Sequence, residues 1–404
     1  MTEATKLLKR TSAILLGLAL VTVPRVGAQT AGMTDRFGSV NFDNPMSLVS
    51  SQLVCGAKVT QGTPIAGNAC GADAICGNAD DGTSGTIGIT GIPMTATVKT
   101  ATLYWTVLTN ANEASNTGQN ISFNGTPIAG TQIGFSPGRT PCFPQSNTVA
   151  WKSDVTSLVS GDGTYTVSGF PGGNQIGGAN FAEGASLEIV YSDPSSPLNT
   201  VVVYEGLAVT NSGGDTLTQT LDAFLANASG PVSATWFPVI GNGQRASETI
   251  TFDGSLASID FSNDLLLDGS TSSRPAGSCS YTDAAGNTEC YWDDDHPDVS
   301  AAIANGDTSA TVNHTHTSDC HTFVAMELVV SADAAAVCPA GGVAVDAACP
   351  PTASYKNHGE YVSCVAHAAE AFLAGLPCVD PALLDEIQSC IVNPRARSDV
   401  GKKP

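Results

Sequence analysis

Alternating hydrophobic and polar residues run through the middle of the chain. Two segments show the alternation most clearly: Ala101, Leu103, Trp105 and Val107 in one, and Ala185, Leu187, Ile189 and Tyr191 in the other. Side chains of a β-strand alternate between its two faces, so this period predicts half-buried strands. Gly, Asn and Asp separate these strands at short intervals, which is typical of an antiparallel sandwich or barrel.

An internal repeat becomes visible when the strands and turns are aligned. The matched pairs, in chain order, are 121–126 with 250–255, Asp154-Val155-Thr156 with Asp298-Val299-Ser300, 161–167 with 306–312, and 187–190 with 326–329. Trp151 and Trp292 precede the two Asp-Val-Thr/Ser strings. The shared order predicts two copies of one β unit, against the alternative of convergent strand-and-turn composition. In each copy the Asp is expected to be structural, because it can accept backbone N–H groups at a corner.

The pattern changes after Asp333. Residues 334–353, rich in Ala, Cys, Gly and Pro, are interpreted as a linker with a small disulfide loop. From Tyr355 to Ile391 the apolar residues take helical spacing, interrupted by Gly375 and Pro377, with Asp380-Pro381 starting a second helix. The predicted fold is all-β: two tandem antiparallel, jelly-roll-like β-sandwich domains followed by a small disulfide-stapled α-helical hairpin. The predicted segments are a signal peptide (1–28), the sandwiches (29–196 and 197–333), the linker (334–353) and the helical module (354–404). Residues 29–93 are expected to supply edge strands and stapled loops of the first sandwich.

Two stretches carry a family resemblance. The repeated order of Asn/Asp-Gly turn, Trp, Asp-Val-Thr/Ser corner and strand resembles the galactose-binding-like jelly roll of secreted bacterial proteins and adhesin-type surface modules. The string from Tyr355 to Ala369 is similar to a helical module appended to exported bacterial proteins. Those tails usually carry Cys where Val400 stands here. The resemblance implies a sandwich topology and a surface role, and it supplies no catalytic residue.

The first 28 residues are typical of an export signal. Lys6, Lys9 and Arg10 precede the apolar run 13–23, and Val26-Gly27-Ala28 supplies small residues for cleavage. The run is too short to cross a hydrocarbon core of ~30 Å, and no later segment is long and apolar enough. The net charge of −21 argues against nucleic acid as a partner. We therefore expect a secreted or cell-surface protein, cleaved near Ala28, with no membrane span in the mature chain.

The even count of 12 cysteines indicates disulfides in an oxidising compartment. Proximity in sequence suggests Cys70 with Cys76, Cys279 with Cys290, and Cys338 with Cys349. In the tail, Cys364 and Cys390 could join the helices, with Cys378 as a competing partner. Spacing alone leaves the connectivity open.

Two clusters are candidate metal sites. Structural calcium is the cofactor considered, on an acidic group of oxygen ligands: Asp293, Asp294, Asp295 and Asp298. A solvated acidic loop is the alternative. A transition-metal site is the weaker hypothesis for the histidines His296, His314, His316 and His321. A rim of hydrogen-bonded polar residues is their alternative.

No catalytic constellation stands out. The GxSxG string at 134–138 places Pro137 where the oxyanion hole of a hydrolase needs a backbone N–H. Glu188 and Glu327 hold matched strand positions and are expected to face solvent. Trp105, Trp151, Trp236 and Trp292 could stack on sugars, but core packing is favoured. The sequence predicts a non-catalytic, adhesin-like binding or structural protein with a glycan or a surface or matrix component as partner. A carbohydrate-binding module or carbohydrate-active hydrolase is the alternative.

Overall fold

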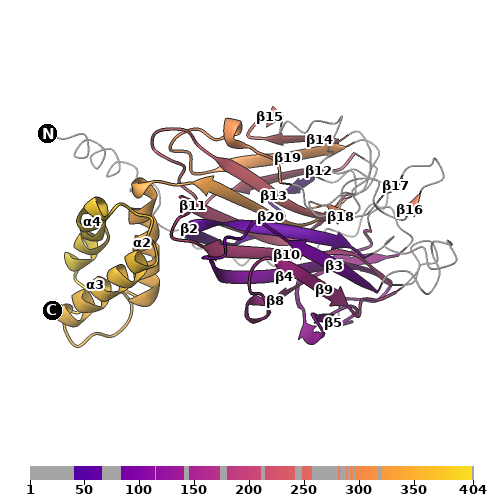
Figure 1. Cartoon of the computed structure of the whole chain (residues 1–404), viewed down its shortest axis with the longest axis horizontal. Coiled ribbons are helices and arrows are strands. Elements are labelled where there is room, and N and C mark those ends of the chain that lie inside the picture. The colour runs from indigo at the N-terminus through magenta and orange to yellow at the C-terminus, as the bar shows by residue number, and fades with distance from the viewer. Residues whose placement is uncertain are drawn as a thin grey trace.

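The computed structural model describes residues 41–65, 83–113, 115–140, 145–172, 180–210, 214–241, 248–256, 281–282, 288–289, 292–293, 296–316 and 321–402. Within them the chain forms antiparallel β-sheets followed by three α-helices (Figure 1). The predicted fold class is confirmed.

The first sandwich packs a four-stranded sheet, ordered β3-β9-β5-β6, on part of a nine-stranded sheet. Its strands are β2 (Met46–Pro64), β3 (Ser84–Ile89), β4 (Thr97–Thr109), β5 (Asn120–Phe123), β6 (Thr126–Ala129), β7 (Thr131–Pro137), β8 (Asn147–Asp154), β9 (Gly163–Ser168) and β10 (Phe181–Ser192). The alternating residues that predicted strands, such as Leu103, Trp105 and Leu187, lie in the core between these sheets.

The second sandwich packs a five-stranded sheet, ordered β1-β12-β19-β14-β15, on the rest of the nine-stranded sheet. Its strands are β1 (Asn41–Asp43), β11 (Leu198–Val209), β12 (Thr216–Leu221), β13 (Ala234–Gly241), β14 (Glu248–Phe252), β15 (Ser255–Leu256), β18 (Trp292–Asp293), β19 (Ala310–His316) and β20 (Thr322–Ser331). A separate hairpin joins β16 (Tyr281–Thr282) to β17 (Thr288–Glu289).

The strand order repeats from one sandwich to the other. In the nine-stranded sheet, β2-β10-β4-β8 corresponds to β11-β20-β13-β18. In the smaller sheets, β3-β9-β5-β6 corresponds to β12-β19-β14-β15. The topology therefore shows the duplication that the sequence repeat predicted.

The matched turns and corners also agree in detail. At the two Asn/Asp-Gly turns, Asn124 Oδ1 accepts from Thr166 N at 2.7 Å and Asp253 Oδ1 from Thr311 N at 2.9 Å. At the corners, Asp154 accepts from Thr156 N at 2.9 Å. Asp298 accepts from Ser300 N at 2.8 Å. The hydrogen bonds lower the pKa of both corner carboxyls. Asp154 and Asp298 thus have the structural role expected of them.

Strand β2 belongs to both sandwiches. Residues 46–55 pair with β11 and residues 56–64 pair with β10. The change of partner falls at Gly56, where a Cβ atom would lie 2.1 Å from the Tyr191 carbonyl oxygen. β1 pairs in parallel with β12 of the second sandwich. The expectation that residues 29–93 serve the first sandwich alone is wrong for 41–55, because pairing with β11 and β12 comes from strands far along the chain.

The two sandwiches pack through the sheet surfaces that face away from the smaller sheets. We call this surface the inter-sandwich interface. It comprises two buried clusters, Val54, Val190, Val201, Val203, Phe237 and Val329 in one, and Tyr104, Ala150, Val239, Trp292, Val324 and Ala325 in the other. Close approach is needed here, since a Cβ on Gly184 would lie 2.3 Å from the Trp292 ring. The Trp292 indole donates to the Ser186 hydroxyl across the interface at 2.8 Å.

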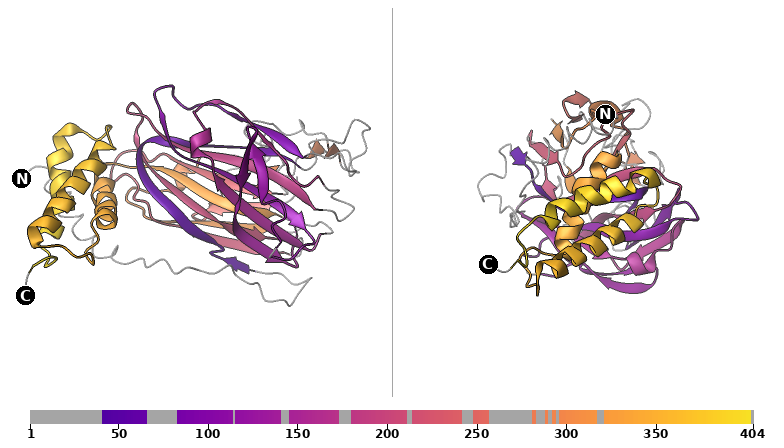
Figure 2. Two further views of the ribbon diagram at one scale, coloured as in Figure 1. Left: turned by 90° about the horizontal axis from the view of Figure 1, so that it is seen from below. Right: turned by 90° about the vertical axis from the view of Figure 1, so that its left-hand side faces the viewer.

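The C-terminal segment forms a helical module at one end of the sandwiches (Figure 2). Its helices are α2 (Ala334–Ala348), α3 (His358–Ala374) and α4 (Leu384–Ala396), the last preceded by the short helix η3 (Pro381–Leu383). The two predicted helices correspond to α3 and α4. The predicted linker is wrong for its first 15 residues, which form α2. Asp333 caps α2 by accepting from Ala335 N at 2.9 Å, and the Ala-rich run favours a helix.

Three disulfides join the described cysteines: Cys55–Cys378, Cys338–Cys390 and Cys349–Cys364. The suggested pairs Cys338–Cys349 and Cys364–Cys390 are wrong. Cys338 lies inside α2 and Cys349 caps its C-terminus, roughly 16 Å further along at a rise of about 1.5 Å per residue, so each bonds a neighbouring helix. Cys70, Cys76, Cys279 and Cys290 lie outside the described residues.

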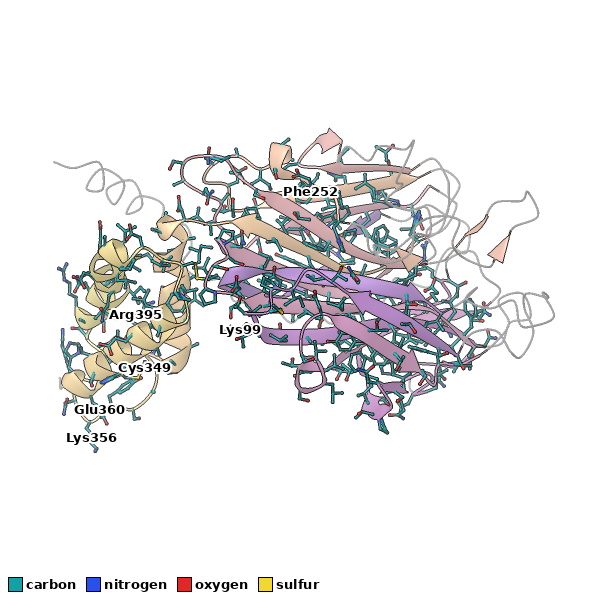
Figure 3. The ribbon with its side chains drawn as sticks, viewed as in Figure 1. Lys99, Phe252, Cys349, Lys356, Glu360 and Arg395 are labelled. Atoms are coloured by element: carbon teal, nitrogen blue, oxygen red, sulfur yellow. A yellow bond between two sulfur atoms is a disulfide. The ribbon has the colours of Figure 1, made fainter. Side chains whose placement is uncertain are left out.

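The disulfides are accompanied by polar contacts inside the helical module. Arg395 lies on α4 (Figure 3). It donates to Asp346 on α2 from Nε at 2.7 Å and from Nη2 at 2.5 Å. Cys55 lies on β2, so the Cys55–Cys378 bridge ties this module covalently to the shared strand.

Candidate functional site

Two of the candidate metal-binding histidines come together inside the second sandwich. His314 on β19 and His321, just before β20, are both fully buried, and their ring centroids lie 4.9 Å apart in an edge-to-face arrangement. His314 also packs edge-on against Phe323 at 5.0 Å. This arrangement is a buried aromatic cluster.

His296 lies elsewhere, on the inter-sandwich interface. Its ring stacks at 4.6 Å from Phe237, and its Nε2 atom is buried without a hydrogen-bond partner. Burial, with a further contribution from the Lys58 charge, lowers the pKa of His296 to about 4. A positive charge so close opposes a cation bound at His296.

The acidic candidates are only partly described. Asp294 and Asp295 lie outside the described residues, as do the side chains of Asp293 and His316. Asp298 is engaged at its corner by Ser300. Among the residues whose side chains are described, no three His, Cys, Asp or Glu converge on a common point.

The four tryptophans have the predicted core positions. Trp105, Trp151, Trp236 and Trp292 are each at most 2% exposed. Trp105 Nε1 donates to the Gly118 carbonyl oxygen at 2.8 Å. None of these indoles presents a face to a sugar in solution.

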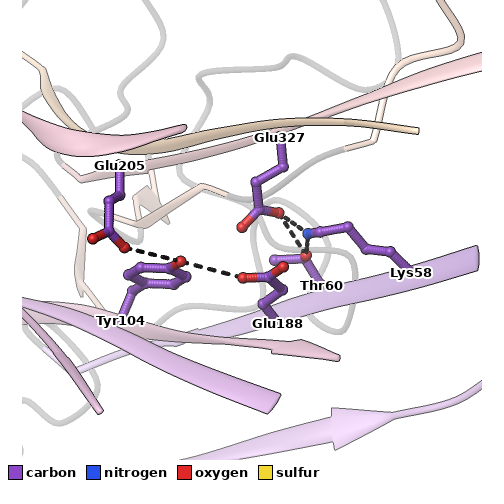
Figure 4. A network of polar contacts seen from close by, with 6 residues as sticks. All are labelled: Lys58, Thr60, Tyr104, Glu188, Glu205 and Glu327. Atoms are coloured by element: carbon purple, nitrogen blue, oxygen red, sulfur yellow. Dashed lines mark hydrogen bonds and ion pairs between the residues drawn. The ribbon is translucent and has the colours of Figure 1, made fainter. Parts of the chain in front are cut away.

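Glu188 and Glu327 are buried, so the expectation that they face solvent is wrong. Glu188 on β10 is 3% exposed and Glu327 on β20 is 0% exposed. Alternation had assigned both correctly to the face away from the core of their own sandwich. That face is covered by the other sandwich, and both carboxylates lie in a polar network between the two (Figure 4).

One arm of the network centres on Tyr104. Its hydroxyl lies 3.2 Å from Glu188 Oε2 and 3.4 Å from Glu205 Oε2, so it bridges β10 of the first sandwich and β11 of the second. Glu205 in turn forms an ion pair with Lys152 on β8. Burial and the two neighbouring carboxylates raise the pKa of Tyr104 well above its usual value. Burial also raises the pKa of Glu188, against the opposing effect of Lys58.

The other arm centres on Lys58 of β2. Lys58 Nζ forms an ion pair with Glu327 Oε2 and donates to the Thr60 hydroxyl. The same hydroxyl donates to Glu327 Oε2 at 3.0 Å. Lys58 also lies over the Phe237 ring, with Nζ 4.6 Å from the centroid. Glu327 Oε1 is buried with no hydrogen-bond partner.

A third buried carboxylate of the interface, Glu183, lies further along β10. It accepts from Thr106 at 2.7 Å and from Thr322 of the second sandwich at 3.4 Å. Burial raises the pKa of Glu183 to about 8, so this carboxyl is mostly protonated at neutral pH. It adds a neutral polar contact between the sandwiches.

The polar contacts of the interface also involve residues that the sequence did not predict: Lys58, Thr60, Tyr104, Lys152, Glu183 and Glu205. Their signal was present: Glu188 and Glu327 each occupy a polar position within an otherwise apolar strand, and Lys58 and Thr60 alternate with Val59. A polar interface buried between the two copies needs charged residues of opposite sign on their outer sheet faces. Glutamates and a lysine at such positions are therefore the sequence signal for this interface.

A chain built of two sandwiches that share a strand and enclose a charged interface is a double β-sandwich protein. The chain belongs to the family described as "Protein of unknown function (DUF3344)", whose model matches residues 79–331. That match covers the first sandwich from just before β3 and the second through β20.

Two solved structures are similar to the chain at low scores. "Structure of PNGF-II in C2 space group" is 10% identical at a TM-score of 0.20, over 68% of this chain and 65% of that one. "Recombinant peptide: N-glycanase F (PNGase F)" is 15% identical at a TM-score of 0.19, over 68% of this chain and 96% of that one. At such scores the likeness carries no argument about activity. No curated protein matches the chain. In the described parts of the chain, no helix has the length and apolarity needed to cross a bilayer.

Proposed function

We propose that this protein is an exported, non-catalytic scaffold whose two sandwiches act as one unit. The observation that carries the proposal is the burial of its chemistry-bearing side chains. The tryptophans fill the cores and the interface, and Glu183, Glu188 and Glu327 are sealed between the sandwiches. A hydrolase or lectin needs such groups to reach a ligand, whereas a scaffold uses them to fix geometry.

The disulfides support a role outside the cytosol. Bonds such as Cys349–Cys364 persist in oxidising compartments, and the basic and apolar segments before Ala28 fit export. Large exposed apolar side chains in the described residues are scattered, at Val49, Met94 and Val343. The surface thus offers no broad apolar patch there, and a partner such as a matrix glycan would be held by polar contacts.

The test is a glycan array combined with an assay of glycoside and glycopeptide turnover. The purified full chain is expected to release no product at any pH between 4 and 9. Product release that disappears in Glu188→Gln or Glu327→Gln would contradict the proposal and favour the hydrolase. Glycan binding without turnover would extend the scaffold to a binding role, and cell fractionation would show whether the chain stays on the surface.

A further inference from the structure

We propose that Lys58 and Glu327 condense into an intramolecular amide that links the two sandwiches covalently. The bond would join the Nζ atom of Lys58 on β2 to the Cδ atom of Glu327 on β20. It goes beyond the scaffold role and does not depend on it, because the evidence lies in the chemistry of these two side chains.

The two groups lie in contact with each other inside the interface. Their side chains are both 0% exposed, and Nζ is in direct contact with Glu327 Oε2. The Phe237 ring covers Lys58 from one side, and Val190 and Val329 belong to the same apolar cluster as Phe237. An amine and a carboxyl group are thus held together where little water can compete for the carboxyl carbon.

Burying the Lys58 ammonium and the Glu327 carboxylate as ions costs free energy. Removing an ammonium and a carboxylate from water is expensive, and the attraction between them offsets this only when all remaining polar atoms have partners. Glu327 Oε1 is buried and has no hydrogen-bond partner. An amide carries no charge and has a single carbonyl oxygen, so condensation removes both the charges and the unpartnered oxygen.

The reaction balances without any further reagent. Nζ, as the neutral amine, attacks Cδ of Glu327, and the N–C bond forms while one C–O bond breaks. The departing oxygen takes the two protons lost by the ammonium and leaves as one water molecule. No oxidant or reductant is needed.

Neighbouring groups can assist each step. The Thr60 hydroxyl already donates to Glu327 Oε2 at 3.0 Å and would keep that bond to the amide carbonyl. Glu188 faces Lys58 from β10, close enough to feel its charge, and can accept the proton that Nζ releases. Holding both reactants in contact makes the step intramolecular, which is worth an effective molarity of about 10⁵ M or more in well-oriented cases.

The second ion pair across the interface provides a contrast. The side chains of Lys152 and Glu205 are 27% and 13% exposed. Water reaches both groups, stabilises the ions and would hydrolyse an activated carboxyl. We expect this pair to stay ionic, which makes the amide specific to the sealed pair.

The experiment is peptide mapping of the full chain by mass spectrometry after reduction, alkylation and digestion. The expected product is a branched peptide that joins the segments of Lys58 and Glu327, lighter than their sum by one water. In Lys58→Met and in Glu327→Ala the two segments should appear separately. Lys99→Met is the matched control, because it removes an exposed lysine and should leave the branch intact. Because the digest is denatured, a poorly folding variant does not affect the wild-type result.

Wild-type protein that yields only separate peptides with unmodified Lys58 and Glu327 would overturn the proposal, as would a branch through Lys152. The role of Glu188 is tested by Glu188→Gln, sampled at intervals after synthesis. The branched fraction should rise more slowly than in wild type, and an unchanged time course would contradict proton transfer through Glu188.

Discussion

Glu188 and Glu327 occupy matched positions in the two sandwiches and have diverged in their partners. Glu188 receives a hydrogen bond from a tyrosine hydroxyl, and burial raises its pKa. Glu327 is paired with the ammonium of Lys58 and receives a hydrogen bond from Thr60. Tyr104, which donates to Glu188, also contacts Glu205 of the second sandwich, whereas Lys58 and Thr60 lie on the shared strand β2. Duplication supplied two equivalent outward positions, and packing the copies together turned them into different halves of one interface.

The largest effect is expected from the disulfide that ties the helical module to β2. Replacing both Cys55 and Cys378 by Ser should lower the free energy of unfolding by about 5 kcal/mol, because the bridge closes a loop of 323 residues. The matched variant lacking Cys349–Cys364, which closes 15 residues, should lose about 3 kcal/mol. Guanidinium titration compares the two, and equal losses would show that loop length does not govern them.

The matched glutamates should differ strongly when truncated. Glu327→Ala leaves the Lys58 amine buried without its carboxyl partner, whether that partner is bound as an ion or through the proposed amide, and should cost at least about 3 kcal/mol. Glu188→Ala removes the same atoms but breaks one hydrogen bond and leaves a cavity, for about 1–3 kcal/mol. Urea unfolding at pH 7 gives both values. A larger loss in free energy of unfolding for Glu188→Ala than for Glu327→Ala would contradict the assignment of Glu327 as the partner of Lys58.

The pH dependence of stability should reveal Glu183. Its folded pKa of about 8 lies above the unfolded value of 4.5, so the folded state holds the proton longer. The contribution of Glu183 is fully present below pH 4.5 and is lost as the pH rises through 8, by up to about 5 kcal/mol. Glu183→Gln should flatten this decline between pH 5 and 9 in thermal melts. A wild-type profile that the substitution leaves unchanged would contradict burial of the ionised carboxylate.

The smallest expected effect comes from the two corners, where the copies are most alike. Asp154→Ala and Asp298→Ala each remove an acceptor for one backbone N–H and should each cost about 1 kcal/mol. Asp154→Asn and Asp298→Asn keep an acceptor and should recover most of the loss. Chemical denaturation measures the loss in free energy of unfolding for each variant. Unequal losses would show that the two corners are not equivalent.

Sequence reasoning succeeded where the information is local. The alternation around Trp105 predicts a strand face because the period of a strand is fixed by its backbone. The turns at Asn124 and Asp253 can be predicted because each side-chain oxygen can accept a hydrogen bond from a backbone N–H of the neighbouring strand. The same local logic found α3 and α4 from apolar spacing and from the break at Gly375.

Prediction from the sequence failed where burial, disulfide pairing or strand pairing depends on a segment far away in the chain. Alternation assigns Glu327 to an outer face but is silent on what covers that face. The partners of Cys338 and Cys349 depend on α2, whose Pro339, Gly341 and Gly342 obscure a helix that close packing against α3 and α4 stabilises. Strand β2 has two partners because β10 and β11 follow each other along it, and nothing near residue 56 in the sequence indicates either strand.

The central claim is that the shared strand and the buried charged interface make the two sandwiches one cooperative unit. Scanning calorimetry of the oxidised full chain tests it most directly, through the ratio of calorimetric to van't Hoff enthalpy for the β region. The account predicts a single transition for both sandwiches, with a ratio near one. Two separate transitions, one for each sandwich, would contradict it.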